Sequence, residues 1–100
     1  MDRKDFENKF IELINILIGI ENLYLPYFQL PNGDIISISI GPLNGTVKCY
    51  RGSLMIYRYL TSRKDDLHLK ILAEYVYQHH NDEQLEKILD DLKLETVRHI

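Results

Sequence analysis

Histidine, cysteine and closely spaced carboxylates could bind a metal ion or carry out acid–base chemistry, but this chain spaces them unfavourably for both. His68 and His79 are eleven residues apart, which separates them by about 16 Å along a helix axis, too far for one metal ion. His79 and His80 cannot face the same way, since adjacent residues diverge on a helix. The chain has one cysteine, Cys49, and no HxxxH or CxxC spacing. We therefore predict no metal site and no cofactor.

Other catalytic arrangements are not indicated either. Adjacent carboxylates such as Asp65 and Asp66 diverge on a helix and do not form an acid–base pair. The Asn-Gly dipeptides at 32–33 and 44–45 predict turns, because no phosphate-loop pattern surrounds them. Cys49 lies in the apolar phase of a predicted strand, which is typical of a core thiol rather than a nucleophile. We expect that the protein is not an enzyme.

One segment has no acidic residue, and it runs from Ile35 to Lys64. Its net charge is +5, whereas residues 1–34 sum to −3 and residues 65–100 sum to −5. A chain polarised in this way favours charged partners, because opposed fields steer association. The predicted partner-binding residues are the cations and tyrosines of this segment: Lys48, Tyr50, Arg51, Tyr57, Arg58, Tyr59, Arg63 and Lys64.

Three interpretations of this basic, tyrosine-rich segment stay open. Its cations could contact phosphates while its tyrosines stack on bases, as in proteins that bind single-stranded nucleic acid. The same side chains could dock on a protein partner, or pair with the acidic helices of their own molecule. A pI near 5.7 disfavours dedicated nucleic-acid binding, which is usually carried by a basic domain.

The elements that must position these residues begin with a helix over residues 3–22. Its apolar residues recur at spacings of three and four, and Asp2 is suited to cap its N-terminus. The Asn-Gly dipeptide at 32–33 predicts a type I′ hairpin turn. Alternating apolar and polar residues predict strands at 24–30, 35–40 and 46–50.

Residues 54–60 decide how large the sheet is. Their aromatic and β-branched side chains favour a strand, whereas Ser53 could instead cap a helix. The last third predicts two helices separated by a break at Asn81, and residues 94–100 could return as a final strand. We predict an α+β fold with an N-terminal helix, an antiparallel sheet of three or four strands and two C-terminal helices. We expect residues 1–100 to form a single domain.

The first helix also suggests self-association. It carries apolar residues on nearly every side, and residues 23–30 add three aromatic side chains. A small domain buries a smaller fraction of its surface than a large one, and an exposed apolar remainder would mark an interface. The sequence therefore predicts a homodimer formed through the N-terminal helix.

At the level of class, the chain resembles small α+β proteins carried by phages and mobile elements, such as anti-CRISPR and other anti-defence inhibitors and immunity proteins. The features that carry this resemblance are size, an AT-biased composition, acidic helices and missing catalytic motifs. It implies a non-catalytic inhibitor of a host defence system that binds a protein partner. The alternative is a nucleic-acid-binding regulator that uses residues 48–64. The apolar run of the first helix is shorter than the roughly 20 residues that span a bilayer, so we expect a cytoplasmic protein, in the host cell if it is phage-encoded.

Overall fold

The structure, a computed structural model, describes residues 1–63 and 66–99, with Arg63 described by its backbone only. Helices, strands and a short 3-10 helix follow one another in an α, four-β, two-α order. The elements are α1 (Arg3–Ile18), β1 (Tyr24–Gln29), β2 (Ile35–Ile40), β3 (Gly45–Arg51), β4 (Leu54–Leu60), η1 (Thr61–Arg63), α2 (Asp66–Gln78) and α3 (Asp82–His99).

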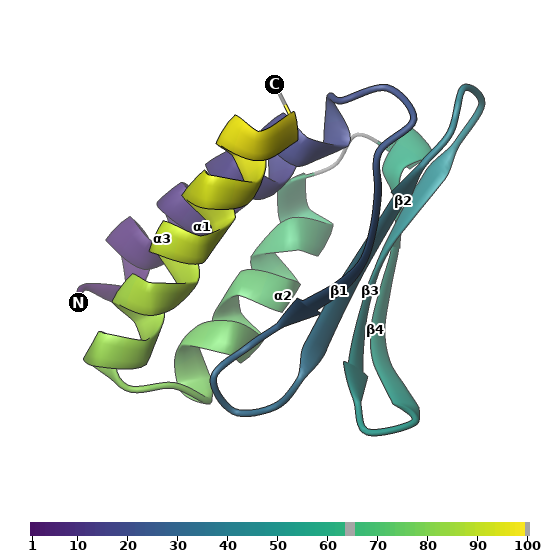
Figure 1. Cartoon of the computed structure of the whole chain (residues 1–100). Coiled ribbons are helices and arrows are strands. Elements are labelled where there is room, and N and C mark those ends of the chain that lie inside the picture. The colour runs from purple at the N-terminus through teal and green to yellow at the C-terminus, as the bar shows by residue number, and fades with distance from the viewer. Residues whose placement is uncertain (64–65, 100) are drawn as a thin grey trace.

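The strands form one antiparallel sheet in the order β1-β2-β3-β4, so each strand pairs with the next one along the chain. All three helices lie on the same side of this sheet (Figure 1). Helix α1 packs against both α2 and α3. The predicted α+β fold is confirmed, and residues 54–60 form a fourth strand rather than a helix. In the described part of the chain, no helix covers the other side of the sheet (Figure 1).

Helix α1 begins where the sequence predicts but ends sooner. The Asp2 carboxylate accepts a hydrogen bond from the backbone N–H of Asp5 (3.3 Å) and caps the N-terminus. The helix ends at Ile18 instead of residue 22. Beyond it the chain tightens into a turn, in which the N–H of Ile20 donates to the Leu17 carbonyl (3.1 Å). Asn22 then takes a positive φ of 59°, which ends any helical path.

The hairpin between β1 and β2 differs from the predicted type I′ turn. A type I′ turn needs positive φ at both central residues, but here only Gly33 has one (φ 95°), and Asn32 does not. The turn closes earlier, through a hydrogen bond from the Gly33 N–H to the Leu30 carbonyl (2.8 Å). Pro31 explains the shift, because its fixed φ suits the first central position of an ordinary turn. Between β3 and β4, Gly52 (φ 61°) supplies the single positive φ at the first position of a two-residue loop.

Helices α2 and α3 are separated at Asn81, as the sequence predicts. The Asn81 side chain accepts a hydrogen bond from the Gln84 N–H, and the Gln84 side chain accepts one from the Asn81 N–H, both at 2.9 Å. This reciprocal pair is a capping box that starts α3. Near the end of α2, His79 and His80 each place Nδ1 2.7 Å from a carbonyl oxygen one turn earlier.

The final strand suggested for residues 94–100 is wrong for the described residues 94–99, which continue α3 to His99. Leu92 and Thr96, four residues apart, are both buried, so helical periodicity continues through this stretch. Leu94 and Val97 are instead exposed on the outer side of the helix. In a stretch this short, the apolar residues fit the spacing of a strand as well as that of a helix. The burial of Thr96 agrees with the helix.

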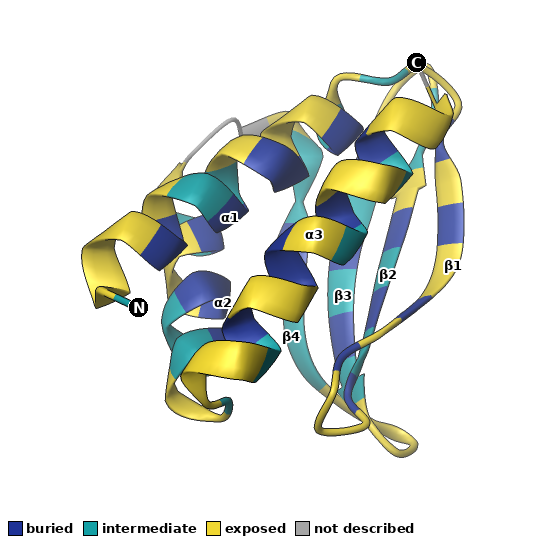
Figure 2. Cartoon of the chain, turned by 60° about the vertical axis from the view of Figure 1, so that its left-hand side comes forward, coloured by how far each residue is buried: buried dark blue, intermediate teal, exposed yellow. Residues whose placement is uncertain are grey.

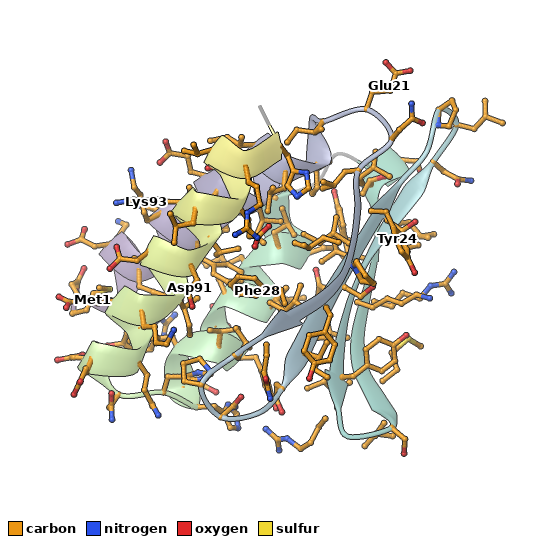
Figure 3. All side chains as sticks on the ribbon, in the orientation of Figure 1. Met1, Glu21, Tyr24, Phe28, Asp91 and Lys93 are labelled. Atoms are coloured by element: carbon orange, nitrogen blue, oxygen red, sulfur yellow. The ribbon has the colours of Figure 1, made fainter. Side chains whose placement is uncertain are left out.

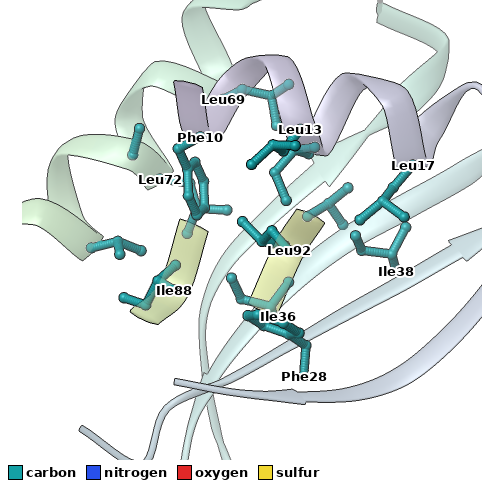
Figure 4. Close-up of a cluster of buried hydrophobic side chains, with 14 of the residues drawn as sticks. Phe10, Leu13, Leu17, Phe28, Ile36, Ile38, Leu69, Leu72, Ile88 and Leu92 are labelled. Carbon is teal, nitrogen blue, oxygen red and sulfur yellow. The ribbon is translucent and has the colours of Figure 1, made fainter. Parts of the chain in front are cut away.

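The hydrophobic core fills the layer between the helices and the sheet. Buried residues recur along the helices and strands, in dark blue in Figure 2. Burying each of these large apolar side chains contributes about 1.5–3 kcal/mol to stability. The side chains that meet at its centre in Figure 4 come from all three helices and two strands: Phe10, Leu13, Leu17, Phe28, Ile36, Ile38, Leu69, Leu72, Ile88 and Leu92.

Most of the apolar surface of α1 that suggested a homodimer is used within the molecule, whereas Tyr24 and Tyr27, which also suggested it, stay exposed. Helix α1 lies between the other two helices, and Phe6, Phe10, Ile14 and Leu17 are fully buried. Ile16 is the one large apolar residue of α1 that is exposed, at 39%. The N-terminal helix therefore offers no large apolar face to a second copy. None of the helices within residues 1–63 and 66–99 has the length and apolar character needed to cross a membrane.

Candidate partner-binding surface

The side of the sheet that faces away from the helices is a candidate binding surface, which we call the open face. The strand register aligns its outward side chains in three rows that run across the strands. The rows are Tyr24–Ser39–Thr46–Leu60, Ser37–Lys48–Arg58 and Gln29–Ile35–Tyr50–Met55. Figure 3 shows the two sides of β1, with Tyr24 directed away from the helices and Phe28 directed toward them.

Lys48 and Arg58 occupy the central row of the open face and lie directly opposite each other on β3 and β4. Like charges in directly opposed positions are destabilising. None of the four strands contains an acidic residue, and neither cation belongs to an ion pair within the described residues. The fold therefore holds two uncompensated positive charges side by side, where an external carboxylate could bridge them.

Aromatic and apolar side chains surround this cationic pair. Tyr24 is 68% exposed and Met55 is 47% exposed, while Tyr50 is half-buried. Ser37 and Ser39 of β2 and Thr46 of β3 belong to the same face. Aromatic residues, methionine and arginine are the residue types enriched in protein–protein interfaces.

Arg51 belongs to a different cluster, although the sequence groups it with Lys48 and Arg58. Its guanidinium donates to both carboxylate oxygens of Asp34, from Nε at 3.2 Å and from Nη2 at 3.3 Å. It also donates to the hydroxyl of Tyr75 on α2, and its charge lies 5.5 Å from the centre of that ring. Arg51 is thereby held at the end of the sheet by Asp34 of the β1–β2 turn and Tyr75 of α2.

Asp34 is the centre of this cluster and is 2% exposed. Tyr75 donates to Asp34 Oδ2 at 3.1 Å, and the Asn32 amide donates to the same oxygen at 3.2 Å. Burial by itself would raise the pKa of Asp34. The hydrogen bonds from Arg51, Tyr75 and Asn32, with the charge of Arg51, outweigh burial and hold the pKa below its ordinary value. The cluster is thus a structural ion pair that fastens α2 to the β1–β2 turn.

Tyr57 and Tyr59 face the helices rather than the open face. The Tyr57 hydroxyl donates to the backbone carbonyl of His68 (2.8 Å), and burial, followed by the proximity of Tyr59, raises the pKa of Tyr57. Tyr59 is 3% exposed, and its ring lies 5.7 Å from the His68 ring. Its predicted role in direct partner contact is therefore wrong. The cause is the irregular register between β3 and β4, which puts residues 57 and 59 in the inward phase.

The remaining predicted residues divide between the open face and the undescribed part of the chain. Lys48, Tyr50 and Arg58 lie together on the open face. Lys64 and the side chain of Arg63 lie outside the described residues. Tyr24 and Met55 join the surface although the sequence analysis did not select them. The strand phase of Tyr24 could have indicated this, since it alternates with the apolar Leu25. The phase of Met55 could not, because the register shift lies beside it.

Cys49 and the residues considered for metal binding form no reactive site in the described part of the chain. Cys49 is buried, and burial, with a smaller effect from Asp34, raises its pKa to about 11. The thiol stays protonated, as expected for a core cysteine. Within residues 1–63 and 66–99, no group of three or more His, Cys, Asp or Glu side chains is arranged to hold a metal ion. A groove of about 590 Å³ lies between α1 and α2, away from the open face, and includes Ile11 and Leu67.

Comparisons of this chain with family models, curated proteins and solved structures found no match.

Proposed function

We propose that this protein is a small non-catalytic binding protein whose open face docks on an acidic surface of a protein partner. The observation that carries the proposal is the Lys48–Arg58 pair, which the strand register places at the centre of a sheet face without acidic residues. A partner carboxylate between the two cations would relieve their repulsion and form charge-assisted hydrogen bonds. Tyr24, Tyr50 and Met55 would supply apolar contact around that carboxylate.

Protein is favoured over nucleic acid by the number of cations on this surface. Of the described Lys and Arg side chains in the acid-free segment, Arg51 is held by Asp34, and two, Lys48 and Arg58, lie on the open face. Lys64 and the side chain of Arg63 are outside the described residues. Binding to a polyanion draws its affinity from many phosphate contacts. Two cations among serine, threonine, isoleucine, leucine and methionine side chains suit a protein surface better.

The biological form that we propose is inhibition by occlusion. A sheet face that covers an acidic patch on a partner blocks that patch without any chemical step. An inhibitor of a host defence system would act in this way, and the resemblance to phage-borne inhibitors supports that role. A nucleic-acid-binding regulator, the alternative from the sequence, would use the cations of residues 48–64, which include Lys48 and Arg58 on the open face.

The test compares capture by three immobilised proteins from a lysate of the source organism, or of its host if the gene is phage-encoded. They are the wild type, the double variant Lys48→Glu/Arg58→Glu, and a matched control, Lys4→Glu/Lys93→Glu. The control reverses two exposed cations on the helices, and Figure 3 shows Lys93 on the side away from the open face. We expect at least one protein to be retained by the wild type and the control but lost with the open-face variant.

A parallel arm measures binding of a mixed single-stranded oligonucleotide pool at low salt. If the oligonucleotides bind and the open-face variant alone abolishes it, the nucleic-acid alternative replaces the proposal. If the open-face variant retains the same proteins as the wild type, the open face is not the binding surface and the proposal is wrong. Circular dichroism of all three proteins confirms that each one is folded.

A further inference from the structure

The two edges of the sheet differ in how well they are protected against pairing with another strand. Edge strands are commonly protected by proline, by a bulge or by charge. At one edge, β1 contains Pro26, and its register is interrupted between Leu25 and Phe28. At the other edge, β4 also has an interrupted register, opposite Cys49 and Tyr50, and its one charged residue is Arg58. It contains no proline, so all of its backbone N–H groups are retained, whereas β1 lacks the one at Pro26. The β4 edge is therefore the better suited of the two to accept a further strand.

The segment of β4 from Leu54 to Arg58 has the exposure that such pairing needs. Leu54 is 65% exposed, Met55 is 47% exposed, and Arg58 is exposed. Within the described residues, β3 is the only strand paired with β4. A strand added beside β4 would extend the rows of the open face, so one of its side chains would lie beside Arg58 and another beside Met55.

The charge of these neighbours selects the chemistry of the added strand. A carboxylate beside Arg58 would also be within the field of Lys48, in the same row. An apolar side chain would complete the contact with Met55. Because side chains alternate along a strand, the two requirements describe an extended segment in which acidic and apolar or β-branched residues share the face.

A second copy of this chain does not meet those requirements. Pairing β4 with another β4 would bring two Arg58 side chains into one small sheet and would add no carboxylate. Pairing with the β1 edge of a second copy also supplies none, since β1 has no acidic residue. Like charges across paired strands are destabilising, so the electrostatics of the edge disfavour self-association.

We infer that β4 accepts an extended acidic segment of a partner protein by antiparallel or parallel strand addition. Backbone hydrogen bonds along Leu54–Arg58 would supply affinity, and the Arg58–Lys48 pair would supply the preference for acidic residues. This inference rests on the proposed function and specifies the partner element that the open face receives.

The probe is a fluorescein-labelled peptide of about eight residues, within the length of an ordinary strand. Its odd positions are alternately Glu and Val and its even positions are Thr, so that Glu and Val share one face. Two derivatives carry N-methyl groups on alternate residues, one in the odd phase and one in the even phase. Only one edge of the peptide can face β4, so one derivative loses the N–H donors that pair with the sheet and the other keeps them. Binding to the full chain is measured by fluorescence anisotropy.

We expect the unmodified peptide to bind and one methylated derivative to bind at least about tenfold more weakly, because several backbone hydrogen bonds are lost. The other derivative should bind about as well as the parent. Replacing every Glu in the peptide by Lys should abolish binding. Amide hydrogen exchange should slow at Leu54–Arg58 when the parent peptide is bound.

Equal binding by both methylated derivatives, or no binding by the parent peptide, would overturn strand addition. Slowed exchange at Leu54–Arg58 that depends on protein concentration alone would overturn it in favour of a second copy. These failures are distinct from failure of the proposed function, which is decided by whether Lys48→Glu/Arg58→Glu loses a captured protein. If a partner is lost with that variant but both methylated peptides bind equally, docking on the open face still stands and strand addition at β4 is wrong.

Discussion

Replacing Lys48 by Glu should make the folded protein more stable while it removes binding. In the wild type, Lys48 and Arg58 are directly opposed on β3 and β4, and a like-charge pair at such a position costs a few tenths to about 1 kcal/mol. Lys48→Glu converts the pair into one of opposite charge, which contributes a similar amount in the favourable direction. The sum is an increase of about 1 kcal/mol in the free energy of unfolding.

The assay is urea unfolding followed by circular dichroism, with thermal unfolding as a second measurement. For a domain of this size, about 1 kcal/mol corresponds to a rise of about 4–8 °C in Tm. The neutral variant Lys48→Gln removes the repulsion without adding attraction and should gain about half as much. The gain should shrink in 1 M salt, where the Debye length falls to about 3 Å.

A double-mutant cycle isolates the cause. In an Arg58→Ala background, Lys48→Glu should have almost no effect, because the opposing charge is absent. An unchanged or lower stability for Lys48→Glu, or an equal gain in both backgrounds, would refute the argument from opposed cations. Lys93→Glu on α3 serves as the matched control for adding an acid at an exposed site.

Three further predictions concern the interior. Asp34→Asn should lower stability at neutral pH by about 1–3 kcal/mol, since a buried acceptor loses its charge-assisted hydrogen bonds. Because the folded-state pKa of Asp34 is lowered, its stabilisation is complete above the ordinary value near 3.8 and is lost as pH falls through the folded value. An acid titration of stability should therefore be flatter for this variant, and identical acid profiles would contradict the role of the cluster. Cys49, with its pKa raised to about 11, should react with a thiol reagent at pH 8 only as fast as the protein opens, and rapid reaction in native buffer would show that the thiol is accessible. Above the unfolded thiol's pKa, stability should fall as pH rises toward 11, an effect absent from Cys49→Ala. Leu92→Ala should cost about 2–5 kcal/mol by leaving a cavity among the helices, and a loss below 1 kcal/mol in urea unfolding would place Leu92 outside the core.

The order of elements could be predicted because each one carries its own local signal. The cap at Asp2, the alternation of Ile36 and Ile38 with serines, and the capping box at Asn81 each depend on residues a few positions apart. The end of α3 could not be predicted, because the apolar residues after Leu92 fit a strand or a helix. Contact with the rest of the core decides between them, through the burial of Thr96.

The candidate surface could be predicted only in part, for the same reason. Lys48, Tyr50 and Arg58 were selected by composition and lie on one face. Arg51 was not separable from them, because its partner Asp34 is seventeen residues away and Tyr75 is on another element. Tyr59 was misplaced because adjacent residues of a strand face opposite sides, so Tyr59 and Arg58 cannot share a face. The register shift between Cys49 and Tyr50 decides which of the two faces inward. Pairing registers and long-range ion pairs are not visible in local patterns.

Because the helices pack on one side of the sheet only, the two sides should tolerate amino-acid substitutions differently. Along β2 and β3, the residues that hold the core, such as Ile38 and Val47, alternate with those that face outward, such as Ser37 and Lys48. Substitutions at the outward positions touch few interior contacts, so each one should cost little stability, and coupling is expected only between directly opposed pairs such as Lys48 and Arg58. The open face can therefore diversify while the interior stays fixed. A library randomised at Ser37, Lys48, Tyr50, Met55 and Arg58 would make this chain a scaffold for selecting new binders.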